Sequence, residues 1–332
     1  MKVLITTFGS SGDVNPFIAV GMALCKRGHE VVFLVNPYFE KQVRDAGLDF
    51  VPLGDHFDLR QILEMPDLMH PRKGLLLTLD MLMVPQMPVT IDAVGSLIRD
   101  LRPDIVLSHS TCTGTHWICE RYGVLSAGAV LAPLVWPSSK DPGVFLSWEP
   151  ENPPGWYLRS RNRISRWLLR RIVDPRFNQV RRRYGFSPQR DLYFTETLGG
   201  VVNLALWSPH YRGPMSDDPP NGRICGFSWF DRHGEFEHPP LDVEEFLSDG
   251  EPPIVFTLGT SAVHIAGSFF GCAAEACRIL GRRGILLTMY PEYAPSTLPS
   301  GVRAFTYVPF STVLPRACAT VHHGGIGTTA QA

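Results

Sequence analysis

The sequence predicts an α/β protein made of two doubly wound domains, each built on a parallel sheet. Short β-branched runs alternate with longer helical patterns in the first half, and the same alternation restarts near residue 253. Strands that alternate with helices favour a parallel sheet with helices on both of its faces. The length of 332 residues is also that of about two domains.

The first series of elements fills residues 1–228 and forms the first predicted domain. We expect its strands at residues 2–8, 30–35, 104–108, 125–131, 201–207 and 223–226. We expect helices at residues 16–27, 38–46 and 114–122, and one long apolar helix at 74–101 that is broken by Pro85 and Pro88. The leucine and methionine side chains of this long helix either line an adaptable apolar pocket or belong to the core.

The second series follows a polar, proline-containing linker at residues 229–252. We expect strands at residues 253–258, 284–289, 303–308 and 319–322, and a helix at 268–280. The sequence ends at Ala332, barely one turn into the helix after the last strand. Because a doubly wound domain needs more strands than these, we expect residues 253–332 to form an incomplete domain.

The composition is that of a soluble globular protein, with 44% apolar and 19% charged residues. A formal net charge of −1 gives no basis for nucleic acid binding. The seven cysteines form no CxxC pair, so we expect buried thiols in a reducing cytoplasm. Residues 9–13 interrupt the first apolar run too early for a signal peptide. We find no apolar stretch of about 20 residues, so we expect no membrane-spanning helix.

The last predicted strand runs into the turn VHHGGIGTT at residues 321–329. Its glycines let the backbone approach a ligand closely, and the helix that follows attracts anions at its start. No Asp or Glu occurs in residues 293–332. His322 and His323 point to opposite faces of the strand, so one of them faces a ligand and a metal pair is not expected. The turn predicts a phosphate site; the alternative is an ordinary turn with two hydrogen-bonded histidines.

The first predicted turn, GSSGDVNP at residues 9–16, lies where a dinucleotide-binding fold has its glycine-rich loop. It carries a carboxylate, and the second strand does not end in an acid that could hold a ribose, so nicotinamide chemistry is disfavoured. Pro16 suits the first position of a helix, which makes Asn15 the expected N-cap and leaves Asp13 just outside the helix. Asp13 is then either a helix cap or a proton acceptor for an attacking hydroxyl.

The turn after the first strand of the second domain, Gly259-Thr260-Ser261, lies in a stretch without acids at residues 252–274. One domain thus carries two turns without acids, and the other carries a turn with a carboxylate. A phosphate leaving group on one side and a proton acceptor on the other are suited to group transfer across a cleft.

A basic segment at residues 156–190 carries eleven arginines together with several aromatic and leucine side chains, among them Trp156 and Trp167. A basic amphipathic helix with aromatic residues can lie on an anionic membrane surface. The alternative is a solvated helix face whose arginines are paired locally.

Three segments together resemble the family 1 nucleotide-sugar-dependent glycosyltransferases of the two-domain GT-B fold: GSSGDVNPFIAVGMALCKRGHEV, PIVFTLGTSA and YVPFSTVLPRACATVHHGGIGTT. The resemblance covers essentially the whole chain. Within the family the chain is most similar to bacterial enzymes that glycosylate lipids, such as the rhamnosyltransferase of rhamnolipid synthesis, and to sterol glucosyltransferases. The resemblance implies that residues 1–228 bind the acceptor and residues 253–332 bind the nucleotide-sugar donor.

The resemblance also implies roles for individual residues. Asp13 falls on the position that activates the acceptor hydroxyl, and His323 on the histidine that holds the donor diphosphate. Other implied diphosphate contacts are Gly324, Gly325, Gly327, Thr328, Gly259 and Thr260. Tyr307 and Val308 are expected to flank the nucleobase, and Gly9 and Gly12 are the glycines of the first turn.

The resemblance implies an inverting displacement at the anomeric carbon that needs no metal, because phosphate-binding groups at a helix start replace a cation. No DxD motif is present, since Asp217 and Asp218 are merely adjacent acids in a loop. We expect no cofactor beyond the UDP- or dTDP-sugar donor. Plant relatives have Trp at the position of Tyr307 and an acidic ribose partner near Gln331, which leaves the choice of nucleotide open.

The expected function is transfer of a hexose to a hydroxyl of a lipid, sterol or other apolar acceptor. We expect a cytoplasmic protein, peripheral to the inner membrane face through residues 156–190. The family's sugar-reading residues follow the segment where this sequence ends, so we expect these 332 residues alone to be inactive. Alternatives are a nucleotide-sugar epimerase or hydrolase on the same fold, a catalytically inactive nucleotide-sugar-binding or partner subunit, and a dinucleotide oxidoreductase.

Overall fold

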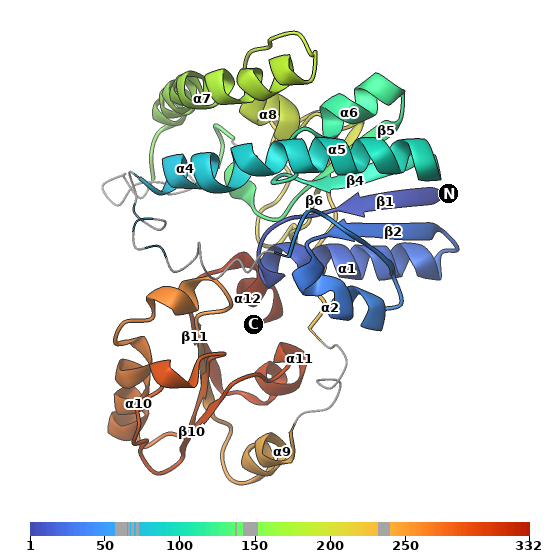
Figure 1. The fold of residues 1–332 in the computed structure, drawn as a ribbon. Coiled ribbons are helices and arrows are strands. Elements are labelled where there is room, and N and C mark those ends of the chain that lie inside the picture. Colours follow the sequence, from blue (N-terminus) through green and yellow to red (C-terminus); the bar gives the residue numbers. More distant parts are fainter. Residues whose placement is uncertain are drawn as a thin grey trace. The chain divides into compact units, whose positions relative to one another are not determined.

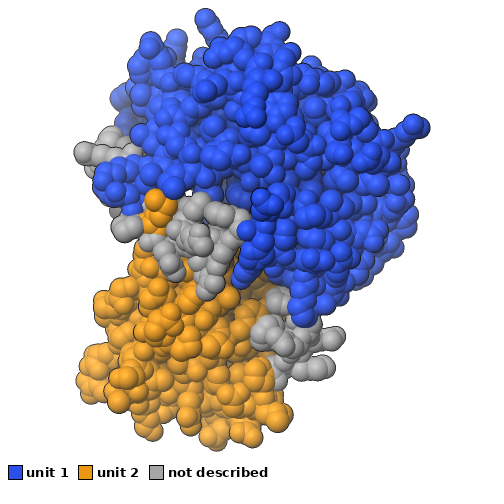
Figure 2. Space-filling view, viewed as in Figure 1, with its two compact units in different colours: residues 1–9, 16–57, 67–228 blue, residues 10–15, 58–66, 229–332 orange. Residues whose placement is uncertain are grey.

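The computed structural model describes residues 1–56, 65, 67, 70, 73–136, 138–141, 152–231 and 240–332. The chain forms two compact units, coloured separately in Figure 2. Unit 1 comprises residues 1–9, 16–57 and 67–228, and unit 2 comprises residues 10–15, 58–66 and 229–332. Each unit contains one parallel sheet, which confirms the predicted fold class of two α/β parallel-sheet domains.

Unit 1 is built on a seven-stranded sheet with the order β3-β2-β1-β4-β5-β6-β7, in which all neighbours are parallel. The strands are β1 (Lys2–Thr6), β2 (Glu30–Val35), β3 (Asp49–Pro52), β4 (Ile105–His109), β5 (Leu125–Val130), β6 (Val202–Ala205) and β7 (Gly222–Ile224). The central strand β1 is buried on both faces, which explains its unbroken apolar run. The sequence does not predict β3, because its four residues DFVP are too few to show a period.

Helices cover both faces of this sheet (Figure 1). On one face lies α1 (Ser11–Lys26), where a Cβ added to Gly21 would lie 3.5 Å from Ile5 Cδ1. On the other face, Ile91 and Trp117 from two further helices share a core with Leu4. The remaining helical segments of unit 1 are η1 (Pro37–Phe39), α2 (Glu40–Asp45), α4 (Gly74–Leu77), η2 (Thr78–Met83), α5 (Val84–Leu101), α6 (Thr115–Tyr122), η3 (Pro133–Val135), α7 (Gly155–Arg183) and α8 (Leu192–Thr197).

The predicted break of the long helix at Pro85 and Pro88 is wrong. Residues 74–101 stay helical throughout, and η2 is a π-helical stretch directly before Pro85. Because the helix is continuous here, Pro85 and Pro88 both lie inside it, and the π-helical stretch η2 just before them marks the local change in hydrogen bonding. The helix Gly74–Leu101 is also long and apolar enough, by length and composition alone, to cross a membrane, contrary to the expectation of no such segment.

The leucines and methionines of this helix divide between core and surface. Leu79 and Met87 are buried in the core of unit 1. Leu75, Leu76 and Met81 are exposed. The core interpretation therefore holds for the inward side of the helix, as in the core helix of a globular protein.

Unit 2 is built on a four-stranded parallel sheet with the order β10-β9-β8-β11. The strands are β8 (Ile254–Thr257), β9 (Gly284–Leu287), β10 (Val302–Phe305) and β11 (Ala319–His322). Phe270 packs with Phe256 on one face, and Val243 and Val313 pack with Val255 on the other. The helical segments are α9 (Leu241–Ser248), η5 (Ala262–Ile265), α10 (Phe269–Leu280), η6 (Pro291–Tyr293), α11 (Phe310–Val313), η7 (Leu314–Arg316) and α12 (Ile326–Gln331).

Helix α9 lies inside the stretch that the sequence assigns to a linker. Val243 and Leu247, four residues apart, lie on one face of α9 and are buried against the sheet of unit 2. The prolines and acids around this pair hide the helix in the sequence. The second half of residues 229–252 is therefore part of the structure of unit 2.

The expectation of buried cysteines is only partly right. All seven are free thiols, and Cys112, Cys119 and Cys277 are buried. The other four are exposed: Cys25, Cys225, Cys272 and Cys318.

A buried carboxyl group holds the start of α6 in unit 1. Glu196 of α8 is 3% exposed, and its Oε1 accepts hydrogen bonds from the backbone N–H groups of Gly114 at 2.8 Å and His116 at 3.2 Å. Burial raises the pKa of Glu196 to about 7, against the lowering effect of these N–H groups and of Arg181. The neighbouring His116 ring lies 2.8 Å from Ser126 Oγ, and burial lowers the pKa of His116 to about 4.

These two groups give opposite pH dependences of stability. Between pH 4.5 and about 7 the native state holds the Glu196 proton that the unfolded state releases, so this contribution to stability falls as the pH rises. Between pH 6.5 and about 4 the unfolded state takes up a proton that native His116 refuses, so stability is lost as the pH falls.

Replacement of Glu196 by Gln should remove the first contribution and keep the hydrogen bonds. Relative to the wild type, Glu196→Gln should lose up to about 3 kcal/mol of unfolding free energy as the pH falls from about 7 to 4.5. The measurement is urea unfolding at a series of pH values, with Glu120→Gln on the exposed side of α6 as the control. If the unfolding free energies of the wild type and Glu196→Gln changed in parallel with pH, the raised pKa of Glu196 would be contradicted.

Candidate functional site

Two turns of unit 2 lie side by side at the carboxyl edge of its sheet. Strand β11 pairs with β8, and His322 is the register partner of Thr257. The turn after β8 begins with Gly259, and the turn after β11 begins with His323. Open α/β sheets bind their ligands at this edge, so the fold brings the two predicted phosphate turns to the place where a ligand is expected.

The His323 ring is packed against glycines of both turns. A Cβ added to Gly259 would lie 2.9 Å from His323 Cε1, and a Cβ on Gly325 would overlap the imidazole ring. Gly259 also has a φ of +62°, which a side chain would disfavour. Thr328, which is buried, has its hydroxyl 3.6 Å from the same Cβ position on Gly259. The glycines are therefore required where the ring fits between two turns.

The two adjacent histidines have different surroundings. The Nδ1 atom of His322 accepts a hydrogen bond from the Gly324 N–H at 3.2 Å, which closes the turn while Gly324 adopts a φ of +79°. Desolvation and the neighbouring His322 both lower the pKa of His323, although its side chain reaches solvent. At neutral pH the His323 ring is therefore neutral, and one of its nitrogens carries an N–H that can donate a hydrogen bond.

Most of the other residues that are predicted to contact the diphosphate lie around the start of α12. Gly325 is the N-cap residue of α12, and Thr328 lies in its first turn. A Cβ on Gly327 would meet no atom within 4 Å, so this position faces open space. Thr260, in the turn after β8, is half-buried.

Tyr307 and Val308 lie after β10, which forms the other end of the same sheet. The Tyr307 hydroxyl donates to the Asp231 carbonyl oxygen at 2.6 Å, and the Ser311 N–H donates to the Asp231 carboxylate at 2.6 Å. Burial, with the Asp231 charge second, raises the pKa of Tyr307. Val308 is buried in a core of unit 2, so only its backbone is available to a ligand.

The prediction that Asp13 lies just outside the first helix is wrong. Helix α1 begins at Ser11, so Asp13 lies inside its first turn and Pro16 inside the helix. The Asp13 carboxylate accepts the Ser10 N–H at 2.7 Å and the Ser10 hydroxyl at 3.0 Å, and the Val14 N–H donates to the Ser10 carbonyl at 3.1 Å. This is the reciprocal half of a capping box, in which the third residue of a helix binds back to the cap. Asn15 is therefore not the N-cap.

The two glycines of the first turn differ in their constraint. Gly9 has a φ of +143°, so it uses a conformation that side chains rarely adopt. A Cβ on Gly12 would lie 3.5 Å from Ser10 Oγ, an ordinary contact. The backbone conformation of this turn therefore depends on Gly9 more than on Gly12.

The sequence interpretation misses His109, a buried polar group at the carboxyl end of β4. Strand β4 is a neighbour of β1, and His109 Nδ1 lies 2.7 Å from Thr111 Oγ1. The Thr111 hydroxyl in turn donates to the Phe8 carbonyl at 2.6 Å. A histidine that directly follows the apolar run IVLS is the sequence signal that could have identified it.

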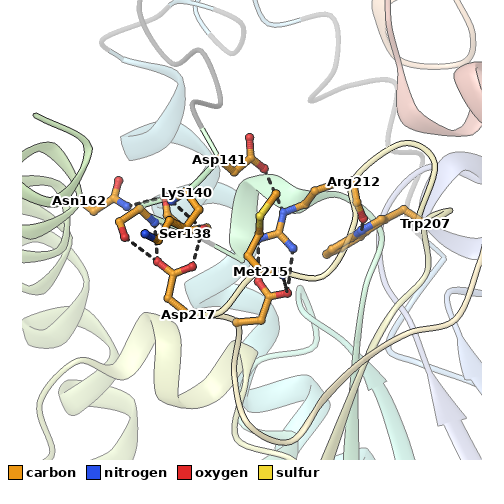
Figure 3. A network of polar contacts seen from close by, with 10 residues as sticks. Ser138, Lys140, Asp141, Asn162, Trp207, Arg212, Met215 and Asp217 are labelled. Atoms are coloured by element: carbon orange, nitrogen blue, oxygen red, sulfur yellow. Dashed lines mark hydrogen bonds and ion pairs between the residues drawn. The ribbon is translucent and has the colours of Figure 1, made fainter. Parts of the chain in front are cut away.

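Asp217 is occupied by structural contacts (Figure 3), and Asp218 is occupied by an ion pair. Asp217 accepts hydrogen bonds from Ser138 and Ser139 at 2.5–2.8 Å, and these bonds, against the effect of burial, lower its pKa to about 2. Asp218 forms an ion pair with the buried Arg212 at 2.7 Å. Within the part of the chain that the structure describes, no group of three or more His, Cys, Asp or Glu residues is placed to hold a metal ion.

Unit 1 contains a cavity of about 260 Å³. His116, Leu125, Ser126 and Val201 contribute to its lining. Leu125 and Ser126 begin β5, and Val201 precedes β6, so the cavity is at the amino edge of the sheet. This is the edge opposite to the one at which α/β folds bind ligands.

The two parallel-sheet units are those of the GT-B fold, and comparisons with known proteins show that the chain is similar to glycosyltransferases. Residues 3–119 match the Glycosyltransferase family 28 N-terminal domain. The solved glycosyltransferase SnogD from Streptomyces nogalater superimposes with a TM-score of 0.63 at 18% identity, over 100% of this chain and 79% of that one. The spinosyn rhamnosyltransferase SpnG, solved with thymidine diphosphate, gives a TM-score of 0.59 at 16% identity, over 100% and 77%.

The predicted resemblance to nucleotide-sugar-dependent glycosyltransferases of the GT-B fold is thereby confirmed. The chain is 29% identical to the O-mycaminosyltylonolide 6-deoxyallosyltransferase of Streptomyces fradiae, over all of the chain and 78% of that protein. It is 25% identical to a sterol 3-beta-glucosyltransferase of Arabidopsis thaliana, over 99% of the chain and 52% of that protein. The chain thus spans about half the length of the plant relative.

A methyl group on Gly325 should displace the His323 ring without straining the backbone, because Gly325 has a φ of −58°. We expect Gly325→Ala to weaken the binding of UDP or dTDP roughly tenfold or more, measured by calorimetry. Gly271→Ala in α10, where a Cβ would meet no atom within 4 Å, is the matched control and should bind like the wild type. Unchanged affinity in a folded Gly325→Ala variant would show that the ring position is unimportant.

Proposed function

We propose that this protein is an inverting, metal-independent glycosyltransferase that moves a hexose from a UDP- or dTDP-sugar to a hydroxyl of a lipid, sterol or other apolar acceptor. The observation that carries the proposal is the His323 ring packed between Gly259 and Gly325 at the carboxyl edge of the unit 2 sheet. Both turns that meet there lie in stretches without acids. A diphosphate is the ligand that such a site suits best.

The proposed donor site uses residues from both turns and from the start of α12. His323 donates a hydrogen bond to the diphosphate, and the Thr328 hydroxyl and exposed backbone N–H groups supply further donors. The residues assigned to the diphosphate are His323, Gly324, Gly325, Gly327, Thr328, Gly259 and Thr260. Tyr307 and the backbone of Val308 flank the nucleobase. Solved neighbours complexed with thymidine diphosphate support dTDP as one of the nucleotides to test.

The proposed reaction is a single displacement at the anomeric carbon of the donor sugar. The acceptor oxygen forms a bond to this carbon as the bond to the diphosphate oxygen breaks, and the bonding electrons leave with the diphosphate. Asp13 takes the proton of the acceptor hydroxyl. A carboxylate is a weak base, so it acts late, when the hydroxyl has become acidic in the transition state. Donors at the diphosphate stabilise the negative charge that develops there, so the proposal includes no metal and no cofactor beyond the donor.

The proposed acceptor is apolar and carries a hydroxyl group. Relatives include the Streptomyces fradiae deoxyallosyltransferase, the Arabidopsis thaliana sterol glucosyltransferase and the 4'-demethylrebeccamycin synthase of Lentzea aerocolonigenes. On the long helix, only its exposed apolar side chains are available to contact an acceptor, namely Leu75, Leu76 and Met81. We place the protein in the cytoplasm, peripheral to the inner membrane face through residues 156–190.

Loss of the imidazole at position 323 should weaken nucleotide binding. We expect His323→Ala to lower the affinity for UDP and dTDP by roughly 10- to 100-fold, the effect of one lost hydrogen bond to a charged group. Calorimetric titration of both nucleotides measures this, and NAD should not bind. His322→Ala removes the contact that closes the turn and one of the two causes that lower the pKa of His323, but keeps the His323 ring, so it should have a smaller effect. Equal affinities of the wild type and His323→Ala would refute the donor site.

Removal of the charge at position 13 should slow transfer and leave nucleotide binding unchanged. We expect Asp13→Asn to lower the rate of sugar transfer to a sterol acceptor by roughly 10²- to 10⁴-fold, because the base is lost. Asn keeps an oxygen that can accept the Ser10 N–H, so α1 should remain capped. The rate is read as acceptor-dependent release of the nucleotide. Donor turnover without an acceptor would instead support an epimerase or hydrolase.

A further inference from the structure

The amino-terminal half of α7 exposes an apolar stripe. Trp156, Ile164, Trp167 and Leu168 are 64%, 58%, 53% and 46% exposed. At 100° per residue these four side chains fall within an arc of about 120° of the helix. Single exposed apolar residues are common, but two tryptophans and two aliphatic residues aligned on one helix face form a patch.

The rest of this helix half is attached to unit 1. Leu158, on the side opposite to the stripe, is buried. The Asn162 side-chain amide donates to the Ser138 carbonyl at 3.0 Å, next to the Asp217 network (Figure 3). Arg166 and Arg170 form ion pairs with Asp191, which lies at the start of α8. These contacts fix the rotation of α7 about its axis, so the stripe faces away from unit 1.

Three arginines beside the stripe have no acidic partner among the described residues. Helix α7 contains ten arginines and a single acid, Asp174. In the described ranges of the chain, no carboxylate lies within ion-pair distance of Arg159, Arg163 or Arg171, which are all exposed. The Arg171 guanidinium lies over the Trp167 ring at 5.1 Å. Local pairing, the alternative to a membrane-facing helix, thus holds for Arg166 and Arg170, whereas the described part of the chain offers no acidic partner to the other three.

We propose that the α7 stripe, defined as Trp156, Ile164, Trp167 and Leu168 with Arg159, Arg163 and Arg171, docks on an anionic lipid bilayer. Indole rings favour the level of the lipid headgroups, and guanidinium groups bind phosphate oxygens at the same depth. Apolar insertion and attraction to anionic lipid together account for both parts of the stripe. Neither a solvated helix face nor local ion pairs accounts for the exposed tryptophans.

A second copy of the chain is a poorer occupant of this surface. A two-fold symmetric contact places the same patch of both copies face to face, which would bring the unpaired arginines of one stripe toward those of the other. Like charges that approach in this way repel each other. The charge of the stripe is complementary to a surface of phosphate groups.

The inference deepens the proposed membrane location but does not depend on sugar transfer. The test is flotation of the 332-residue chain with phosphatidylcholine vesicles that contain phosphatidylglycerol, compared with phosphatidylcholine alone. We expect binding to the anionic vesicles to be at least about tenfold tighter and to weaken as salt is added. The tryptophan emission should shift to the blue when the indoles enter the headgroup region.

Two variants of the stripe and one control separate the parts of the interaction. Trp156→Ser/Trp167→Ser and Arg159→Gln/Arg163→Gln/Arg171→Gln should each weaken vesicle binding by about tenfold or more. The charge-matched control Arg27→Gln/Arg223→Gln/Arg303→Gln, at exposed sites outside α7, should stay within about twofold of the wild type. Equal losses in the control and in the stripe variants would overturn the proposal, as would a folded wild type that does not bind the anionic vesicles.

Two further readouts keep the outcomes separate. Sedimentation velocity in the absence of lipid should show no association that the tryptophan substitutions abolish; a dimer lost in that variant would assign the stripe to a second copy and overturn the proposal. Binding of UDP and dTDP should be the same in all stripe variants. Vesicle binding by a chain that binds neither nucleotide would leave this inference standing and refute the proposed donor site.

Discussion

The register between β8 and β11 determines which histidine meets Gly259. Four residue pairs, from Ala319 with Ile254 to His322 with Thr257, set this register in a parallel ladder. Side chains alternate between the two faces of a strand, so a slip by one residue would exchange the positions of His322 and His323. The identity of the ring in the candidate site therefore depends on backbone pairing inside the sheet, several residues before the turn begins.

The glycines of the site act through the same geometry. Gly259 and Gly325 come from turns that are far apart in the sequence, and each leaves room for the His323 ring. Once the sheet sets the distance between the turns, a methyl group on either glycine would push the ring out of place. The pattern GGIG is thus explained in part by packing within the protein, in addition to any approach of the backbone to phosphate.

A comparable long-range constraint operates in unit 1. Glu196 comes from α8 and binds the N–H groups that begin α6, directly after the turn that contains Thr111. Burial of the carboxyl group raises its pKa, and the positive charge of Arg181 compensates for this effect only in part. The turn at the carboxyl end of β4, and with it His109, is therefore held by a residue about eighty positions later in the chain.

How far the sequence predicts this protein depends on the range of the interactions involved. Periodicity predicts most strands of both sheets and the two turns of unit 2, because each signal is complete within about ten residues. It fails for the start of α1, where the Ser10–Asp13 contact outweighs the preference of Pro16 for a first helical position. It fails for α9, where only Val243 and Leu247 mark the buried face. The packing of His323 between two glycines could not be predicted, because it requires the distance between two strands to be known.

The electrostatics of His323 suggest how the proposed phosphate site would work with little net charge. Desolvation and the adjacent His322 lower the pKa of His323, so the ring is neutral before a ligand arrives. A site that relied on the positive charge of an imidazolium would lack that charge at neutral pH. In the arrangement seen here, one neutral N–H, the Thr328 hydroxyl and backbone N–H groups at a helix start would share the phosphate charge among several dipoles. In the proposed donor site such donors would be aligned before binding, and they would stabilise the diphosphate without a full positive charge.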